Sequence, residues 1–351
     1  FIYNANRIER HLLHDSRTSS SLSNDVVWSM LSDFNGNLWF GTDDGLSMTP
    51  RIQEIPFIPI FQITGQGAGN HFYSIYRDVS GILWLGGSNG LISSSSTLSS
   101  PQTSHWYRVD NAAYPIAHNR IRQIYEDREH HLWICTDGGL HRLIGRQWHR
   151  YNLEDKSRTK NANWAYNVYE DEKGRLWVAT CLGGVLVVNK HKLENSKDFC
   201  IADYSFNTSN GLAGMFVNQL VPDGNGYIWV LLYNNGLQRI NMKSMRIEST
   251  GLDNLRGDNN PSFLLSDSKR NLWVGLRGGV LSLGSKKDKP YMIKFKNFNQ
   301  SEVTAMTEVK NEIWVCSTDG VWIIDKRHKT ARRIYSSSRT FTCMYYDNRS
   351  N

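Results

Sequence analysis

The amino-acid sequence predicts an all-β fold built from a repeated unit. Aromatic residues make up 12% of the 351 residues, and 28 Gly stand against 8 Pro, a composition typical of short strands joined by tight turns. Repeatedly, an aliphatic residue, a Trp and a second apolar residue follow one another, and a Gly comes shortly afterwards. The Trp residues of this pattern lie 41 to 52 residues apart: Trp39, Trp84, Trp133, Trp177, Trp229, Trp273 and Trp314. A period of this length indicates a radial β-repeat in which each unit forms one small sheet.

Each unit carries a turn signal ahead of its Trp. At the sixth position before the Trp the last unit has Glu308, and the others have Asp33, Asp78, Asp127, Asp171, Asp223 and Asp267. Gly stands three positions before the Trp in several units, as Gly36, Gly81, Gly174 and Gly226. In such a turn the Asp carboxylate accepts backbone N–H bonds and Gly supplies a positive φ. Because Asp recurs once in each unit, we interpret it as a turn residue and not as a metal ligand.

Four segments of each unit fit the strands of one antiparallel sheet. Apolar runs before the turn predict first strands, for example at 26–31, 121–125 and 263–265. The Leu-Trp-Val run predicts a second strand that is buried between neighbouring sheets. Third strands are expected at 140–143, 185–188 and 321–324, and outer fourth strands at 148–151, 204–206 and 332–335. This pattern predicts a seven-bladed β-propeller of three- to four-stranded antiparallel blades, with the Trp residues packed between the blades.

We expect residues 1–351 to form one β-propeller domain with a partial flanking repeat at each end. Residues 1–13 resemble the third and fourth strands of a unit, and residues 340–351 resemble a first strand and turn with Asp347 at the repeated Asp position. The ends therefore predict a fragment of a longer repeat array. The alternative is an eight-bladed propeller with one blade shared between the termini. Seven blades are favoured because the shared blade would lack its Trp strand.

Charge and cysteine content narrow the classes of function. Lys and Arg exceed Asp and Glu by 40 − 33, a net charge of +7, but the basic residues are scattered, so we expect no nucleic-acid partner. The five Cys residues are widely spaced without a CxxC motif, which argues against a disulfide framework or a zinc site. Cys135 and Cys316 each follow a repeat Trp by two positions, where most units have Gly or Ala, and are expected to be small buried residues.

Signals for catalysis and for a membrane span are absent from the sequence. It contains no nucleophile elbow, P-loop or HExxH motif, and its 11 His residues are scattered without ligand spacing. We therefore expect no catalytic residue, no metal ligand and no cofactor. No run of apolar residues is long enough to predict a membrane-spanning helix.

The repeat D-x-x-G-x-L-W, followed by a hydrophobic residue and G-T-x-x-G-L, is similar to the two-component-regulator propeller repeat. The clearest copy is DFNGNLWFGTDDGL at 33–46, and the leader SLSNDV at 21–26 resembles the usual approach to the first strand in that family. The resemblance extends over essentially the whole chain. It is weaker at Trp229, where Leu231 and Leu232 replace Gly-Thr, and at Trp314, where the turn is formed by residues 308–311.

This resemblance implies an extracytoplasmic sensor region of a bacterial hybrid two-component system. Such sensors carry two tandem propellers followed by a small β-sandwich, and they respond to oligosaccharides. The resemblance implies that this chain is one propeller of the pair, lies in the periplasm, and binds an oligosaccharide, acidic ones included. The implied protein partners are a neighbouring propeller or β-sandwich domain and a second copy in a homodimeric full-length sensor. The histidine kinase that receives the signal is not present in this chain, so the chain is not expected to be an enzyme.

A ligand site is expected where the loops that lead into the first strands gather around the propeller axis. Amides can accept and donate hydrogen bonds with sugar hydroxyls, Trp can stack on a sugar face, and Arg can pair with a uronate or sulfate. Asn24 and Asn260 occupy such positions, but Asn is also a common turn residue. The candidate ligand-binding residues are Asn70, His71, Asn119, Arg120, Asn163, Trp164 and Asn218.

Two other functions remain open from the sequence. A propeller enzyme, such as a lyase or a glycosidase, would need acids and bases that break the repeat and converge on the axis, and no such His–Glu cluster is evident. A protein-interaction scaffold would bind through its loops, although the Gly-His and Trp-Asp marks of WD-type propellers are absent.

Overall fold

The computed structural model describes most of the chain, which divides into two compact units. The described residues are 2–4, 7–10, 13–16, 21–32, 38–49, 71–95, 104–156, 164–197, 199–252, 257, 260–284, 289–296, 300–336 and 340–347. One unit comprises residues 1–57 with 332–336, and the other comprises residues 58–331 with 337–351.

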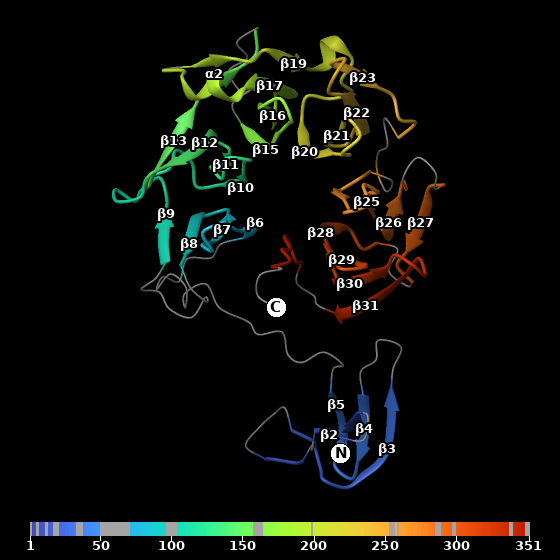
Figure 1. The fold of residues 1–351 in the computed structure, drawn as a ribbon. Coiled ribbons are helices and arrows are strands. Elements are labelled where there is room, and N and C mark those ends of the chain that lie inside the picture. Colours follow the sequence, from blue (N-terminus) through green and yellow to red (C-terminus); the bar gives the residue numbers. More distant parts are fainter. Residues whose placement is uncertain are drawn as a thin grey trace. The chain divides into compact units, whose positions relative to one another are not determined.

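Within the described residues, six four-stranded antiparallel sheets follow one another along the chain and are arranged in a ring (Figure 1). The innermost strands are β6 (Phe72–Arg77), β10 (Ile121–Glu126), β15 (Ala165–Glu170), β20 (Val217–Pro222), β24 (Phe263–Ser266) and β28 (Val303–Val309). The second strands, which carry the repeat Trp residues, are β7 (Leu83–Gly87), β11 (Leu132–Thr136), β16 (Arg175–Thr180), β21 (Tyr227–Leu232), β25 (Leu272–Leu276) and β29 (Glu312–Ser317).

The outer half of each sheet also follows the sequence order. The third strands are β8 (Gly90–Ser94), β12 (Gly139–Ile144), β17 (Val185–Asn189), β22 (Gly236–Asn241), β26 (Gly279–Ser282) and β30 (Gly320–Asp325). The fourth strands are β9 (Ser104–Tyr107), β13 (Gln147–Tyr151), β19 (Tyr204–Phe206), β23 (Arg246–Glu248), β27 (Tyr291–Lys294) and β31 (Thr330–Ser336). The strand positions expected from the sequence are confirmed in all four places of the sheet, and so is the all-β propeller class.

The remaining elements are short. The first unit holds the three-stranded sheet β3 (Val27–Ser32), β4 (Leu38–Thr42) and β5 (Gly45–Thr49), and the pair β1 (Ile2–Asn4) and β2 (Arg7–Arg10). The second unit adds the parallel pair β14 (Leu153–Glu154) and β18 (Cys200–Ile201), the helix α2 (Lys190–Glu194) and the 3-10 turn η3 (Thr208–Asn210). None of the described helices is long and apolar enough to cross a membrane.

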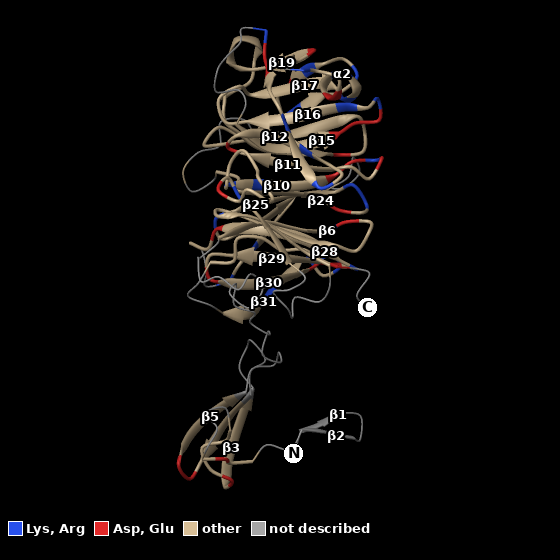
Figure 2. Cartoon of the chain, turned by 90° about the vertical axis from the view of Figure 1, so that its left-hand side faces the viewer, with Lys and Arg blue, Asp and Glu red and all other residues tan. Residues whose placement is uncertain are grey.

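The repeated Asp shapes the turn between the first and second strands, as the sequence predicts. One oxygen of Asp127 accepts the backbone N–H groups of Glu129 and His131, both at 2.9 Å. The other accepts the indole N–H of Trp133 at 2.9 Å. The same indole bond recurs from Trp84 to Asp78, from Trp177 to Asp171 and from Trp273 to Asp267. Figure 2 shows acidic residues in the turns along one edge of the stacked sheets. Asp33 and Gly36 lie outside the described residues.

The assignment of Glu308 to the repeated Asp position is wrong. Glu308 pairs with Ile313, which is the register of Glu126 with Leu132 in another sheet, one place before the Asp. The shift arises because β28 and β29 join through the two-residue turn of Lys310 and Asn311, so this turn is one residue shorter. Glu308 accepts the backbone N–H of Ser268 in the preceding sheet, as Glu126 accepts that of Val79 and Glu170 that of Arg128.

The hydrophobic core lies between neighbouring sheets. Trp133 is fully buried, and its cluster joins Cys135 and Leu140 to Val168 and Leu186 of the next sheet. Trp177 and Trp273 are buried in the same way against the sheets that follow them. These contacts confirm that Trp133, Trp177 and Trp273 are packing residues, and Trp84 and Trp229 are buried in further clusters. Trp39 and Trp314 are only partly buried. Cys135 and Cys316 are buried free thiols, also as expected, and burial raises the pKa of Cys316 to about 12.

The segment 340–347 lies between β28 and β6 and completes the innermost layer. The Ser262 hydroxyl donates to the carbonyl of Val303 at 2.7 Å. The hydroxyl of Thr304 donates in the same sense to the carbonyl of Phe341, and that of Thr342 to the carbonyl of Phe72. Arg77 also pairs with Asp347 at 2.6 Å. These contacts agree with the sequence alignment of this segment with a first strand, although it forms no regular strand and residues 348–351 lie outside the described residues. The number of blades and the single-domain organisation of residues 1–351 stay predictions.

Candidate functional site

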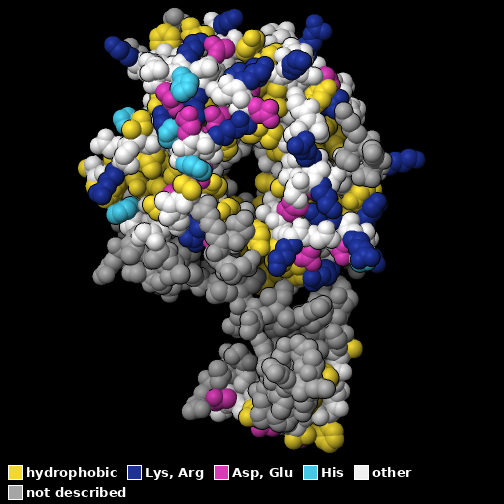
Figure 3. Space-filling view, in the orientation of Figure 1, with side chains coloured by type: hydrophobic (Ala, Val, Ile, Leu, Met, Phe, Trp, Pro, Cys, Tyr) yellow, Lys and Arg dark blue, Asp and Glu magenta, His cyan; other side chains and the backbone are white. Residues whose placement is uncertain are grey.

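The innermost strands surround a cavity of about 480 Å³, and Figure 3 shows the opening in the middle of the ring of sheets. Each innermost strand contributes a residue at or next to its first position to the wall of this cavity, and the segment 340–347 contributes one residue in the corresponding place. We call these seven residues the channel ring: Tyr73, Arg122, Tyr166, Asn218, Ser262, Thr304 and Thr342.

The residue after four of the ring positions, namely Tyr73, Arg122, Tyr166 and Asn218, connects neighbouring innermost strands. The side chains of Ser74, Gln123 and Asn167 accept the backbone N–H groups of Ile124, Val168 and Leu220, respectively, from the next innermost strand. Gln219 accepts from Leu264 in the same manner at 2.9 Å. These bonds connect successive sheets around the cavity, so the side-chain oxygens involved are engaged within the protein.

The channel ring itself has two chemically different halves. Ser262, Thr304 and Thr342 carry small hydroxyls that are used in the bonds between innermost strands. The other half carries the larger side chains of Tyr73, Arg122, Tyr166 and Asn218.

Arg122 is fixed at the centre of the second half. Its Nε donates to Oδ1 of Asp137 at 2.7 Å and its Nη2 donates to Oδ2 at 2.9 Å. The guanidinium also lies 4.3 Å from the ring centre of Tyr166 and 5.8 Å from that of Tyr73. Burial opposes the charge of Arg122, but the Asp137 carboxylate outweighs it and raises the Arg122 pKa. Burial raises the pKa of Tyr166 to about 12, so its phenol stays protonated, and this phenol lies within hydrogen-bond reach of the Cys181 thiol.

A second guanidinium shares the same carboxylate. Nη1 of Arg120 lies 3.3 Å from Oδ2 of Asp137, and the Arg120 side chain is 45% exposed. Asp137 is 7% exposed, so one buried carboxylate holds two arginines. The arrangement leaves further guanidinium N–H groups for an anion, because a guanidinium has five N–H donors in a planar fork.

The structure brings only some of the candidate residues to this place. Asn218 belongs to the channel ring and Arg120 to the arginine pair. Trp164 lies 42% exposed just before Tyr166, and its carbonyl accepts from the Cys181 backbone at 3.0 Å. Asn70 and Asn163 lie outside the described residues.

Other candidates have bonds within the protein. Asn119 accepts the Val109 N–H at 2.8 Å through its side chain. His71 is exposed, and its backbone N–H and carbonyl both bond to Ser88. Asn24, in the first unit, accepts the N–H of Val26 at 2.7 Å, as a turn residue does. The whole candidate set stays a prediction as regards ligand binding.

The sequence did not single out Tyr73, Arg122, Asp137 or Tyr166. A signal is present in retrospect, because Arg122 interrupts the apolar run of β10 and a charged residue within an innermost strand needs a partner. Asp137 could not be paired with it by spacing alone, since the two lie on different strands of the sheet.

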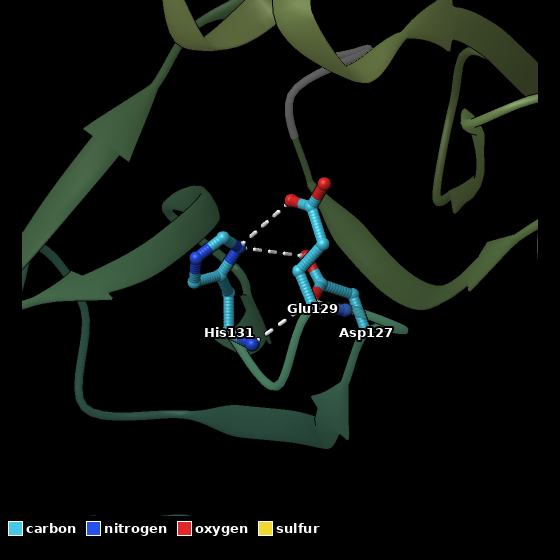
Figure 4. Close-up of side chains that lie close together, drawn as sticks. All are labelled: Asp127, Glu129 and His131. Atoms are coloured by element: carbon cyan, nitrogen blue, oxygen red, sulfur yellow. Dashed lines mark hydrogen bonds and ion pairs between the residues drawn. The ribbon is translucent and has the colours of Figure 1, made fainter.

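A second charged cluster lies in a turn at the edge of the ring. Asp127, Glu129 and His131 each offer one ligand atom, and these atoms all lie within 4.8 Å of one another (Figure 4). The buried ammonium of Lys190 lies 3.2 Å from Asp127, 3.0 Å from Glu129 and 2.8 Å from Glu170. The position that a cation would take is therefore filled by the side chain of Lys190, the first residue of helix α2.

A similar lysine arrangement recurs at Lys326. Lys326 contacts Glu308 and also lies 3.7 Å from Asp267 of the preceding sheet. In the same way, Lys190 contacts Glu170 and also Asp127 of the preceding sheet. Burial disfavours the charge of Lys190, but the hydrogen bonds to Glu170 and Glu129 and the Asp127 charge together raise its pKa. The cluster is thus an inter-sheet ion-pair network.

Comparison with known proteins identifies the family. The family model named two-component regulator propeller matches residues 21–44, 115–138 and 159–181. Two crystal structures of the extracellular domain of BT4673 from B. thetaiotaomicron are 43% identical to this chain, cover 99% of it and superpose with a TM-score of 0.81. BT4673 is described as a hybrid two-component system with one of these structures and as a one-component system with the other. The chain belongs to the two-component regulator propeller family.

Other comparisons add less. The extracellular domain of BT3049, named a hybrid two-component system of B. thetaiotaomicron, is 17% identical over 93% of this chain and 50% of its own, with a TM-score of 0.50, and shows the fold alone. No curated protein matches the chain. The chain spans 47% of the length of the BT4673 chains.

Proposed function

We propose that this chain is the extracytoplasmic, ligand-sensing propeller of a hybrid two-component protein. In this role it recognises an oligosaccharide and relays the signal to a histidine kinase that lies outside the chain. The observation that carries the proposal is the 43% identity to the BT4673 extracellular domain over 99% of this chain, together with the family repeats. The periplasm is the corresponding compartment.

The chemistry of the channel ring supports a sugar ligand. Tyr73 and Tyr166 offer aromatic faces and phenol groups, Asn218 offers an amide, and Arg122 offers charged donors. Sugars present both apolar ring faces and dense hydroxyls, so a site that combines aromatic rings with a few fixed polar groups suits them. The cavity volume of about 480 Å³ lies within the usual range for small-molecule sites.

Binding is favoured over hydrolysis by the composition of the cavity wall. Its described lining residues include no Asp, Glu or His. Glycoside hydrolysis ordinarily needs two carboxyl groups placed on either side of the scissile bond. The lining therefore supports a binding site and not a glycosidase centre.

The partners of this sensor follow from the same resemblance. A neighbouring propeller or β-sandwich of the same protein would receive the binding signal, and a homodimer would carry it to the kinase. No described residue is needed for catalysis in this scheme, because the chain acts by binding alone.

Isothermal titration calorimetry of the chain with a panel of neutral and acidic oligosaccharides tests the proposal. We expect saturable binding of at least one of them and about fivefold or greater weakening by Tyr166→Ala, because a stacked aromatic contributes at least about 1 kcal/mol. Met292→Ala, on an exposed outer strand, is the matched control. Absence of binding to every sugar, together with turnover of any of them, would contradict the sensor assignment.

A further inference from the structure

We propose that the site takes an oligosaccharide with a single carboxylate, a uronic acid, whose acidic group binds at Arg120 and Arg122. This inference rests on the proposed sugar-binding function and names the ligand class for the same site. It is carried by the charge balance at Asp137 and by the division of the channel ring into two halves.

The difference between the two halves of the channel ring indicates on which side the ligand binds. On one side the hydroxyls of Ser262, Thr304 and Thr342 are engaged with backbone carbonyls of the next innermost strand. On the other side Asn218 has no hydrogen-bond partner among the described residues, and Arg122 retains N–H groups beyond its two bonds to Asp137. The free hydrogen-bond donors that an anionic ligand needs therefore lie on the side of Arg122.

The charges of Arg120, Arg122 and Asp137 indicate which ligand charge the site favours. Two guanidiniums share one carboxylate, so Arg120, Arg122 and Asp137 together carry a formal charge of 2 − 1 = +1. Arg122 is also the one charged residue among the described residues that line the cavity. A ligand with one negative charge neutralises this site. A heavily sulfated sugar would bring several negative charges to a cavity wall with one basic residue.

The geometry suits a carboxylate on a sugar ring. Arg122 is held in place by its two-point bond to Asp137 and by the Tyr166 ring 4.3 Å away, so its remaining donors have a fixed direction. Arg120 is half exposed and holds Asp137 at 3.3 Å through one nitrogen, so it can turn toward an incoming anion. A carboxylate accepts paired N–H bonds from guanidinium groups. The sugar hydroxyls would then bond to the Asn218 amide and the Tyr73 phenol, since the Tyr166 phenol lies at the Cys181 thiol.

Matched acid and ester pairs test the inference. The chain is titrated calorimetrically with trisaccharides that each carry a single galacturonate, glucuronate or mannuronate residue, and with their methyl esters, which keep the shape and remove the charge. We expect at least one acid to bind about tenfold or more tightly than its ester, as expected for hydrogen bonds to a charged group. A trisulfated heparin disaccharide is expected to bind more weakly than that acid.

Two variants locate the carboxylate. Arg120→Met removes an exposed guanidinium without opening the core, and we expect it to reduce the acid-to-ester ratio severalfold. Arg122→Met is expected to abolish the ratio, with its thermal unfolding measured in parallel. Lys294→Met, an exposed outer-strand cation, is the control and should leave the ratio unchanged.

The outcomes separate the two claims. Equal binding of acid and ester, tighter binding of the sulfated disaccharide, or an unchanged ratio in Arg120→Met would overturn the uronate inference while sugar sensing stands. If none of these sugars and none of the neutral panel binds the folded chain, the proposed function itself fails.

Discussion

Asp127 accepts the indole N–H of Trp133, six residues further along the chain, at 2.9 Å. The bond joins the turn that Asp127 organises to the side chain that fills the space between two sheets. Both residues are buried, and Lys190, which begins helix α2 directly after β17 of the next sheet, reaches the same carboxylate. One Asp therefore connects the local turn, the second strand and the neighbouring sheet, which explains why Asp and Trp recur together in the sequence.

We expect Trp133→Phe to destabilise the protein by about 1–3 kcal/mol, because it leaves a buried Asp127 oxygen without its indole donor. Trp133→Ala should cost more, about 3–5 kcal/mol, since it also leaves a cavity. Urea unfolding followed by far-UV circular dichroism measures both. Trp28 donates to Asp43 from a side chain that is 74% exposed, so Trp28→Phe should have little effect, and equal losses at the two sites would contradict the role of burial.

Lys190→Met should destabilise the protein by about 3–5 kcal/mol, because it leaves the buried carboxylates of Asp127 and Glu170 without their cation. Lys192 pairs with Asp203 from a side chain that is 46% exposed, so Lys192→Met should cost less than about 1 kcal/mol. Denaturant midpoints of the two variants give the comparison. A loss at Lys190 no larger than that at Lys192 would show that the network contributes little.

Stability should fall as the solution is acidified. Burial raises the pKa of Asp127, but the bonds from Trp133, His131 and Lys190 outweigh burial and lower it, and the pKa of Asp171 is lowered in the same way. A depressed folded-state pKa gives stability that is present above the unfolded value of about 3.9 and is lost as the pH falls through the folded value.

Unfolding free energies between pH 7 and pH 2 measure this dependence. Asp127→Asn should be less stable at pH 7 and should show a shallower loss of stability below pH 4 than the unaltered chain. A pH profile that is flat from pH 5 to pH 2, or one that rises on acidification, would contradict the assigned direction of the pKa shifts.

Thr342→Val should loosen the segment 340–347, because the Thr342 hydroxyl bonds to the carbonyl of Phe72 and holds that segment beside β6. Hydrogen–deuterium exchange of the peptide that covers this segment should accelerate, while exchange in β10 to β12 should stay as it is. Thr340 is exposed, so Thr340→Val is the matched control. Unchanged exchange in Thr342→Val would show that other contacts hold the segment.

The strands and turns could be predicted because their signals are local. The Asp turn and the Trp strand lie within one repeat. Because the same short pattern occurs in several repeats, the strand and turn positions can be predicted even though each single copy is a weak signal. The same locality explains the error at Glu308, since counting back from Trp314 assumes a turn of constant length and that turn is one residue shorter.

The site could be predicted only in part because its contacts cross between strands and sheets. Arg122 and Asp137 are 15 residues apart, and Lys190 and Asp127 are 63 residues apart. Nothing in the spacing of these residues pairs them. The loop positions include Arg120 and Asn218 of the candidate site. Arg122 and Tyr166 lie within innermost strands, and only the packing of those strands around one cavity brings them together.

The most direct test of a sugar-binding channel is the crystal structure of the chain from crystals soaked with the oligosaccharide that binds most tightly in the calorimetric panel. We expect the sugar to lie in the channel ring, in contact with Arg122, Tyr166 and Asn218. A sugar bound elsewhere on the protein, with the channel ring unchanged, would contradict the account.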